Sequence, residues 1–278
     1  MRSSYILLLI LFSMAPGLLS AKSKKIAKVV IDAGHGGKDF GAQGSISKEK
    51  DITLAVSLKL GKIFNDSMKA VQVIYTRTVD DYPSLVERHE IANKANADLF
   101  IAIHVNSTPF TYTKVMEGYK TVTKKHKKVK VPVYRSIRHH TTTRSGVETY
   151  VMGIHRADQQ KDAIEGSEFV TNEPGLLDEN DPSTAIVVAQ YSQAFLGKSV
   201  TLASKIQEQF TLSGRNDLGV KQKGLEVLAG SAMPGVLVEI GFITNAEEEA
   251  YLNSEKGQRD VALAIYKGIK AYKTEIEK

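Results

Sequence analysis

Short apolar runs recur along the chain, separated by longer segments in which apolar and polar residues mix. Six runs are rich in β-branched or large apolar side chains, at residues 29–31, 71–75, 99–103, 147–151, 225–228 and 235–240. Several are nearly continuous rather than alternating, which is typical of strands buried on both faces of a parallel sheet. The pattern predicts a twisted, mostly parallel sheet of about six strands.

The segments between these runs carry apolar residues at helical spacing. This spacing predicts helices over residues 51–65, 83–95, 181–210 and 254–274. Pro83 and Pro182 suit the first turn of a helix, because the N–H that proline lacks would be unpaired there. Strands that alternate with helices favour an α/β fold in which helices flank the sheet.

Two segments do not fit this alternation. Residues 108–145 are basic, and residues 153–181 are polar and acidic. Each is long for a structureless connection within a compact domain, so we expect it to be functional, flexible or structured by itself. The sequence therefore predicts a single domain over residues 22–278 that carries two insertions.

The first residues have the pattern of a secretory signal peptide. Arg2 precedes an apolar stretch at 5–12, and the small residues Ser20 and Ala21 follow. The stretch is too short for a bilayer span of about 20 residues, although an uncleaved anchor is the alternative. We expect residues 1–21 to be removed, and the mature chain to be exported to the periplasm or cell wall without a transmembrane segment.

Composition narrows the chemistry. The chain has no cysteine, so it forms no disulfides, and any metal ligands come from His, Asp and Glu. Between Lys114 and Arg144 lie ten Lys or Arg residues and one acid, Glu117, whereas the whole chain carries a formal charge of only +6. The excess of positive over negative charge is therefore located in the first insertion. An exported chain of this kind is a poor candidate for nucleic-acid binding.

Two histidines follow apolar runs directly. His35 lies in the glycine-rich turn after residues 29–31, and His104 ends the run at 99–103. The ends of neighbouring parallel strands meet at one edge of a sheet, where ligands bind in open α/β folds. Two imidazoles at that edge suit a zinc site with a third protein ligand, although a loop histidine without chemistry fits His35 as well.

Two glutamates are candidates to complete this site. Glu49 precedes the predicted helix at 51–65 and is the best third ligand, although a first-turn glutamate also favours the helix dipole. Glu239 interrupts an apolar run, where an ionised carboxylate is costly unless it is paired. At the end of a strand it can act as a general base and acid, or as a structural ion-pair partner.

These residues and their surroundings resemble the zinc-dependent N-acetylmuramoyl-L-alanine amidases of bacterial cell walls. The resemblance extends from about residue 28 to 252 in the order of the family. The matching motifs are 31–37, 49–52, 76–77 with Asp80, 85–88, 92–93, 97–106, 146–150 and 238–245.

The resemblance implies one zinc ion per chain on His35, Glu49 and His104, with Glu239 as the catalytic carboxylate. The implied substrate is peptidoglycan, cut between N-acetylmuramic acid and L-alanine during cell-wall remodelling or daughter-cell separation. The alternatives are a zinc peptidase of the wall that cuts another amide, and a non-enzymatic module that binds or regulates the wall.

Other family positions have structural interpretations. Arg77, Asp80 and Arg88 are expected to form an ion-pair network beneath the site. Glu148 is expected to make a cross-strand salt bridge, although it also suits the surroundings of a metal. Asn106 is expected either to orient a ligand or to cap its loop.

The insertions carry two further hypotheses. In residues 108–145, tyrosines 112, 119 and 134 interleave with lysines; a flexible solvated loop is the simpler interpretation, and a strip that steers peptidoglycan carboxylates is the alternative. His126, His139 and His140 are interpreted as surface residues. Some family members carry a regulatory helix that covers the zinc. In the second insertion, 153–181, a helix within 157–169 is the candidate for this role, and an activator protein that binds the insertion would release it.

Overall fold

The computed structural model describes residues 25–139, 142–167 and 182–278. The predicted signal peptide at 1–21 lies outside the described residues. Within the described ranges, no helix is long and apolar enough to cross a membrane.

A six-stranded sheet forms the centre of the molecule, in the order β2-β1-β3-β8-β6-β7. Its strands are β1 (Lys28–Ala33), β2 (Gln72–Tyr75), β3 (Leu99–Asn106), β6 (Val147–Met152), β7 (Asp217–Lys223) and β8 (Gly235–Phe242). Neighbours run parallel except β6 and β8, which pair antiparallel. The predicted fold, a mostly parallel sheet flanked by helices, is confirmed.

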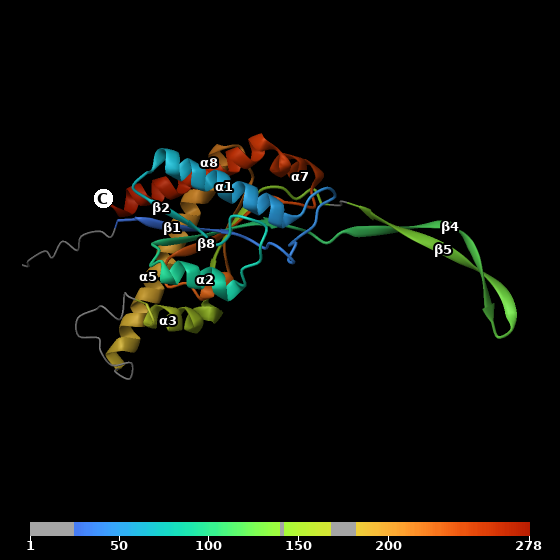
Figure 1. The fold of residues 1–278 in the computed structure, drawn as a ribbon, viewed down its shortest axis with the longest axis horizontal. Helices are drawn as coiled ribbons and strands as arrows, with labels where there is room; N and C mark the ends of the chain where they lie inside the picture. Colours follow the sequence, from blue (N-terminus) through green and yellow to red (C-terminus); the bar gives the residue numbers. More distant parts are fainter. Residues whose placement is uncertain (1–24, 140–141, 168–181) are drawn as a thin grey trace, which may run out of the picture.

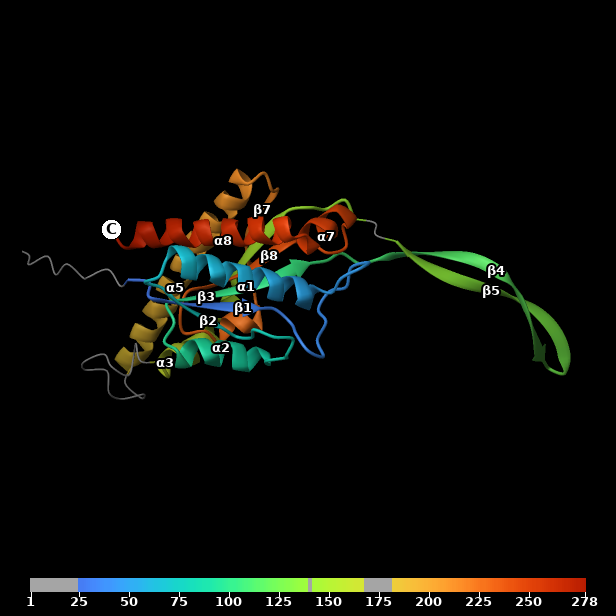
Figure 2. The same cartoon turned by 45° about the horizontal axis from the view of Figure 1, so that its top comes forward.

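Helices cover both faces of this sheet (Figures 1 and 2). Three long helices build the larger hydrophobic core on one face: α1 (Glu49–Ser67), α5 (Pro182–Leu212) and α8 (Glu255–Ile276). The other face packs against α2 (Leu85–Lys94) and α6 (Glu226–Ala229). The short helix α7 (Ala246–Asn253) follows β8 and leads into α8.

The strands alternate between these two cores. In β3, Ile101 and Ile103 belong to the core under α1 and α8, whereas Phe100 and Ala102 belong to the core under α2 and α6. Successive side chains of a strand point to opposite faces, so His104 continues the second set. Its Cα partner on β8 is Glu239, which therefore lies on the same face.

Some predicted elements differ from the structure. The run at 225–228 is wrong as a strand, because it forms the short helix α6. The sixth strand is instead β7, an edge strand whose polar, partly exposed residues give little apolar signal. Helices α1, α2, α5 and α8 confirm the four helical segments, and α7 was not predicted.

The first insertion has structure of its own. Strands β4 (Thr111–Lys124) and β5 (Lys127–His139) pair antiparallel into a ribbon that projects from the body (Figures 1 and 2). The two residues that join them, Lys125 and His126, have φ angles of 46° and 65°, as the tight turn of a twisted hairpin requires. The interpretation of 108–145 as a flexible loop is wrong for this hairpin, which we call the arm (residues 111–139).

Candidate functional site

His35 lies in a tight turn directly after β1. Its φ angle is 59°, and reciprocal backbone hydrogen bonds of 2.9 Å between Gly36 and Asp39 close the turn behind it. A Cβ atom on Gly34 would lie 2.4 Å from Cε1 of His104, so only glycine lets the turn approach that imidazole. The two rings meet edge to face, with centroids 4.9 Å apart.

Glu49 joins the two histidines. It is the first residue of α1, and its carboxylate is buried between the two rings. Its Oε1 lies 3.0 Å from Nδ1 of His104, and its Oε2 lies 3.2 Å from Nε2 of His35. The backbone N–H of Val105 donates to Oε1 at 2.9 Å, and that of Ala42 donates to Oε2 at 2.7 Å. The carboxylate is thus fixed by backbone at both oxygens.

One ligand atom from each of His35, Glu49 and His104 falls within 4.8 Å of the others. Burial alone would lower the pKa of His35, but hydrogen bonds and charges from Glu49 and Asp39 raise it to about 9. Burial would likewise raise the pKa of Glu49, but hydrogen bonds from both histidines hold it far below its usual range. The pocket therefore favours positive charge, and two imidazoles with a carboxylate are a donor set that zinc accepts.

Asp39 orients the first of these ligands. Its Oδ2 lies 2.8 Å from Nδ1 of His35, and its Oδ1 accepts a hydrogen bond of 3.0 Å from the N–H of Gly41. A carboxylate on the far nitrogen fixes the tautomer and leaves Nε2 available for a metal. Asp39 lies four residues after His35 in the sequence, but that spacing alone does not predict the contact.

The turn is supported from below by two buried arginines. Arg88 pairs with Asp32 at 2.6 Å and donates to the carbonyls of Ala33 and His35, both at 2.7 Å. Arg77 donates from Nη2 to the carbonyl of Gly34 at 2.9 Å. Backbone carbonyls thus take most of these donors, so the predicted ion-pair network is only partly correct.

Asp80 has a different partner from the one expected. Its Oδ2 pairs with Lys50 at 2.6 Å, and its Oδ1 accepts a hydrogen bond of 2.8 Å from the N–H of Gly37. It therefore fastens the outer part of the His35 turn to the start of α1.

Glu249, on α7, holds the loop that leads to Glu49. Its carboxylate accepts hydrogen bonds of 2.8–3.0 Å from the N–H groups of Ser45, Ile46 and Ser47. A side chain on Gly44 would collide with this carboxylate, because its Cβ would lie 2.0 Å from Oε1. A glutamate that acts across some 200 residues leaves no local pattern in the sequence, so its role is not predictable from the neighbouring residues.

Glu239 lies beside the three candidate ligands, with His104 as its partner on β3 and Glu148 as its partner on β6. Its Oε2 is buried and has no hydrogen-bond partner among the described residues. Burial, with the nearby charges of Glu49 and Glu148, raises its pKa to about 7 against the opposing charge of His104. A carboxyl group with this pKa can accept and return a proton near neutral pH.

Glu148 makes the expected cross-strand salt bridge. Its Oε1 lies 2.9 Å from Nζ of Lys221 on β7, and the hydroxyl of Tyr150 donates to its Oε2 at 2.5 Å. Asn106 both donates to Glu148 at 3.2 Å and accepts from the N–H of Ser107 at 2.8 Å. Asn106 therefore caps its loop and also holds the strand beside Glu239.

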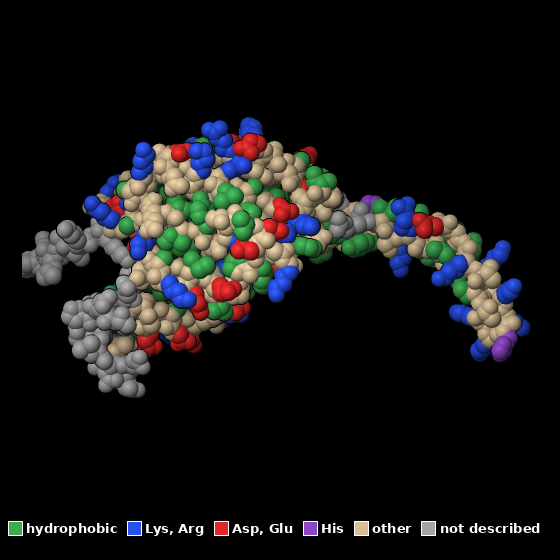
Figure 3. All heavy atoms as spheres, in the orientation of Figure 1, with side chains coloured by type: hydrophobic (Ala, Val, Ile, Leu, Met, Phe, Trp, Pro, Cys, Tyr) green, Lys and Arg blue, Asp and Glu red, His purple; other side chains and the backbone are tan. Residues whose placement is uncertain are grey.

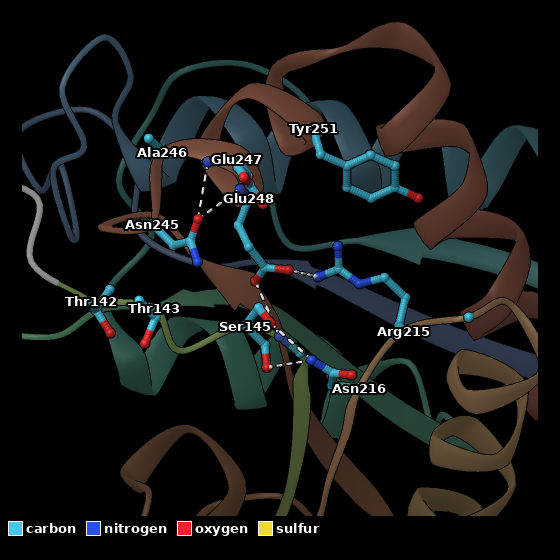
Figure 4. A pocket seen from close by; sticks show the side chains of 12 residues that line it. Thr142, Thr143, Ser145, Arg215, Asn216, Asn245, Ala246, Glu247, Glu248 and Tyr251 are labelled. Atoms are coloured by element: carbon cyan, nitrogen blue, oxygen red, sulfur yellow. Dashed lines mark hydrogen bonds and ion pairs between the residues drawn. The ribbon is translucent and has the colours of Figure 1, made fainter.

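A separate cavity of about 530 Å³ opens near the start of α7 (Figure 4). Arg215 and Glu248 point toward one another across it at 2.8 Å, and Asn245 caps α7 through Glu247 and Glu248. None of the four candidate site residues lines this cavity. The Arg215–Glu248 pair ties α7 to the sheet, because Arg215 also donates to the carbonyl of Ile240 at 2.9 Å.

The described part of the second insertion does not cover the site. Helix α3 (Ala157–Glu165) buries Ile164 against α5, and Gln160 donates at 3.4 Å to the carbonyl of Ser231, just before β8. Since β8 runs parallel to β3, this is the edge of the sheet opposite His104. The prediction of a covering helix is therefore wrong for residues 157–165, and residues 168–181 lie outside the described residues.

Comparison with known proteins identifies a family of amidases. Residues 29–271 match the family profile of N-acetylmuramoyl-L-alanine amidase. The chain is 30% identical to the uncharacterized protein YqiI of Bacillus subtilis, over 94% of this chain and 91% of that protein. It is 29% identical to N-acetylmuramoyl-L-alanine amidase AmiA of Escherichia coli, over 88% of this chain and 75% of that protein.

A solved structure has the same fold. The crystal structure of N-acetylmuramoyl-L-alanine amidase from Clostridium difficile 630 superposes with a TM-score of 0.59 and 25% identity, covering 90% of this chain and 97% of that one. The profile match extends across both halves of the sheet and includes all four candidate site residues. The chain belongs to the N-acetylmuramoyl-L-alanine amidase family.

Proposed function

We propose that the chain hydrolyses the amide between N-acetylmuramic acid and L-alanine in peptidoglycan, with zinc held by His35, Glu49 and His104 and with Glu239 as the catalytic carboxylate. One juxtaposition supports this proposal above all. Three ligand atoms lie within 4.8 Å of one another, beside a buried carboxyl oxygen that has no hydrogen-bond partner among the described residues. Such a set has little structural purpose by itself, because an unpaired buried carboxyl group costs stability.

A zinc ion bound there supplies a Lewis acid that polarises the amide carbonyl and lowers the pKa of water. The protein supplies the proton transfers. Glu239 takes a proton from the attacking water and returns it to the nitrogen of the departing L-alanine. Asp39 keeps His35 in the tautomer that leaves Nε2 free, at a His–Asp distance of 2.8 Å.

We place this activity outside the cytoplasm. Residues 1–21 have the composition of a signal peptide, and the catalytic domain is proposed to be 22–278, acting in the periplasm or cell wall during wall remodelling or daughter-cell separation. An activator protein that binds 153–181 remains a prediction. Because α3 lies at the edge opposite the site, such an activator would not act by withdrawing that helix.

Digestion of purified sacculi by the wild-type protein and by Glu239→Gln tests the proposal, with zinc content measured in both. We expect about one zinc per chain in both proteins, and new L-alanine amino termini from the wild type only. General acid–base catalysis is worth about 10²–10⁴-fold, so the variant should lose at least that much activity. Full activity of the variant would refute the role of Glu239, and cleavage at another amide would make the chain a wall peptidase of different specificity.

A further inference from the structure

The arm presents all three of its tyrosines on one face. Residues directly opposite one another in a ribbon share a face, and the face alternates along each strand. The β4–β5 register therefore places three tyrosines and three lysines on one face, which we call the tyrosine face: Tyr112, Lys114, Tyr119, Lys128, Lys130 and Tyr134. The opposite face carries paired aliphatic side chains such as Val122 and Val129, together with further basic residues: Lys120, Lys124, Lys127 and Arg135.

The tyrosines are exposed to an unusual degree for their size. Tyr112, Tyr119 and Tyr134 are 62%, 63% and 54% exposed, and the main contacts of β4 and β5 among the described residues are with each other. A bulge between Met116 and Gly118 places Tyr119 on the same face as Tyr134, with the Gly118–Val133 pair between their two pairs of the register. A ribbon of two strands is only marginally stable alone in water, so a ligand on this face would also stabilise the arm.

The charge of the arm indicates an anionic ligand. Residues 111–139 contain nine Lys or Arg and one acid, Glu117. That acid is already paired with Arg135 at 2.9 Å. Figure 3 shows basic side chains spread along the whole arm, whereas the body carries both basic and acidic side chains. A polymer with repeated carboxylates fits this distribution better than a compact anion does.

The arm begins at the candidate site. It leaves the sheet from β3, which carries His104, and returns to β6, which carries Glu148. Its outgoing leg is fastened where the N–H of Thr108 donates to Oγ1 of Thr244, and its returning leg where Asn245 donates to the carbonyl of Arg144, both at 3.0 Å. Thr244 and Asn245 follow β8, the strand of Glu239.

We propose that the tyrosine face of the arm is a binding surface for the peptidoglycan strand, remote from the bond that is cut. The tyrosine rings would stack on the sugar rings of the glycan, and Lys114, Lys128 and Lys130 would pair with free carboxylates of the stem peptides. A 14-residue strand extends about 45 Å, which is enough to contact several repeats of a polymer held at the site. This inference rests on the proposed function, because it takes its ligand from that substrate.

Two other occupants fit the arm less well. Membrane-surface elements typically insert Trp, Phe and Leu, whereas the chain has no Trp and the arm presents tyrosine and valine. The arms of two copies of this chain would repel one another, since both arms are strongly basic. The peptidoglycan strand is the ligand that fits best, because it is anionic and extended. It is also the proposed substrate of the site next to the base of the arm.

The test measures binding separately from cleavage. Co-sedimentation with purified sacculi uses Glu239→Gln as the parent, so that the ligand stays intact during the assay. We expect the triple change Tyr112→Ala, Tyr119→Ala, Tyr134→Ala to weaken binding at least tenfold. The separate triple change Lys114→Gln, Lys128→Gln, Lys130→Gln should weaken sacculus binding more strongly than the tyrosine change does at low salt. It should also make binding less dependent on salt concentration.

A matched control removes three exposed lysines of the body, with Lys69→Gln, Lys198→Gln and Lys270→Gln, and should bind as the parent does. Sacculi whose carboxylates have been amidated should lose the contribution of the arm lysines. In the Glu239-intact background, all arm variants should still hydrolyse a short soluble muropeptide at the wild-type rate, which shows that the site is folded.

Three results would overturn the proposal. The first is unchanged sacculus binding by both arm variants. The second is equal loss by the body-lysine control, which would indicate a general charge effect. The third is preferential binding of the arm to anionic phospholipid vesicles. Failure of the amidase assignment would appear separately, as absent L-alanine termini from the wild-type protein while sacculus binding persists.

Discussion

Oε1 of Glu49 lies 3.0 Å from Nδ1 of His104, although Glu49 begins a helix on one face of the sheet and His104 faces the other. The carboxylate reaches across the sheet edge because the N–H groups of Val105 and Ala42 hold it there at 2.9 and 2.7 Å. The candidate metal centre is therefore assembled between two layers of the fold.

Replacing Glu49 should remove metal binding while leaving the fold. Glu49→Gln keeps the size of the side chain but removes the negative charge that both histidines face. Because changes to groups that only support a ligand cost about 10–100-fold in metal affinity, we expect a loss of about 100-fold or more here. Competition with a zinc chelator measures it, and Asp51→Asn, an exposed change in the same turn, should bind zinc normally.

Asp39→Asn tests the orientation of His35. The amide can still contact Nδ1 but no longer stabilises positive charge on the ring, so zinc affinity should fall about 10–100-fold with little change in unfolding temperature. The same chelator assay reports this loss. Wild-type affinity in the variant would show that the 2.8 Å contact is incidental.

Gly34→Ala should damage the site through sterics alone. The new methyl group would lie 2.4 Å from Cε1 of His104, so that imidazole or the turn must move. We expect a loss of about 1–3 kcal/mol in the free energy of unfolding together with weakened zinc binding. Gly197→Ala in α5 meets no atom within 4 Å and should instead stabilise the helix by up to about 1 kcal/mol.

Arg88→Met should be among the most destabilising changes that spare the candidate ligands. It leaves the fully buried Asp32 without its cation, which typically costs about 3–5 kcal/mol. Chemical denaturation measures the loss. The double variant Asp32→Asn, Arg88→Met should recover part of it, because no unpaired charge then remains; equal instability of both variants would contradict this explanation.

The metal-free protein should lose stability as pH rises toward neutrality because of Glu239. The pKa of this group is about 7 in the folded chain and 4.5 as a reference for the unfolded chain. A raised folded pKa gives a contribution that is complete below 4.5 and is lost as pH rises through 7. Relative to Glu239→Gln, the chelated wild type should lose about 3 kcal/mol between pH 4.5 and 8. Urea unfolding at several pH values measures this difference. If the free energy of unfolding depended on pH equally in the chelated wild type and in Glu239→Gln, the prediction would be wrong.

Local patterns were enough to predict much of the fold and the ligand set. His35 and His104 each end an apolar run, and parallel neighbours necessarily bring such ends together, as the pairing of β1 with β3 does. The helix that carries Glu49 was recognisable from its spacing. These inferences succeed because burial on both faces leaves a periodic trace in the sequence.

The residues that support the candidate ligands leave no periodic pattern in the sequence. Arg88 and Arg77 bind backbone carbonyls of the His35 turn, and a carbonyl carries no sequence signature. Glu249 holds the loop before Glu49 from more than 200 residues away. β7 was missed because an edge strand needs little apolar character, and 225–228 was assigned wrongly because a short buried helix and a buried strand share the same apolar composition.

The order of strands has a mechanical consequence for the arm. Its two legs leave from β3 and β6, and β8, the strand of Glu239, runs between them in the sheet. Each leg is bonded to one of the two consecutive residues Thr244 and Asn245 that follow β8. The arm is thus attached to the body at two points, both next to the end of β8. A force applied along the arm would be distributed over both attachments and across β8 instead of acting on a single connection.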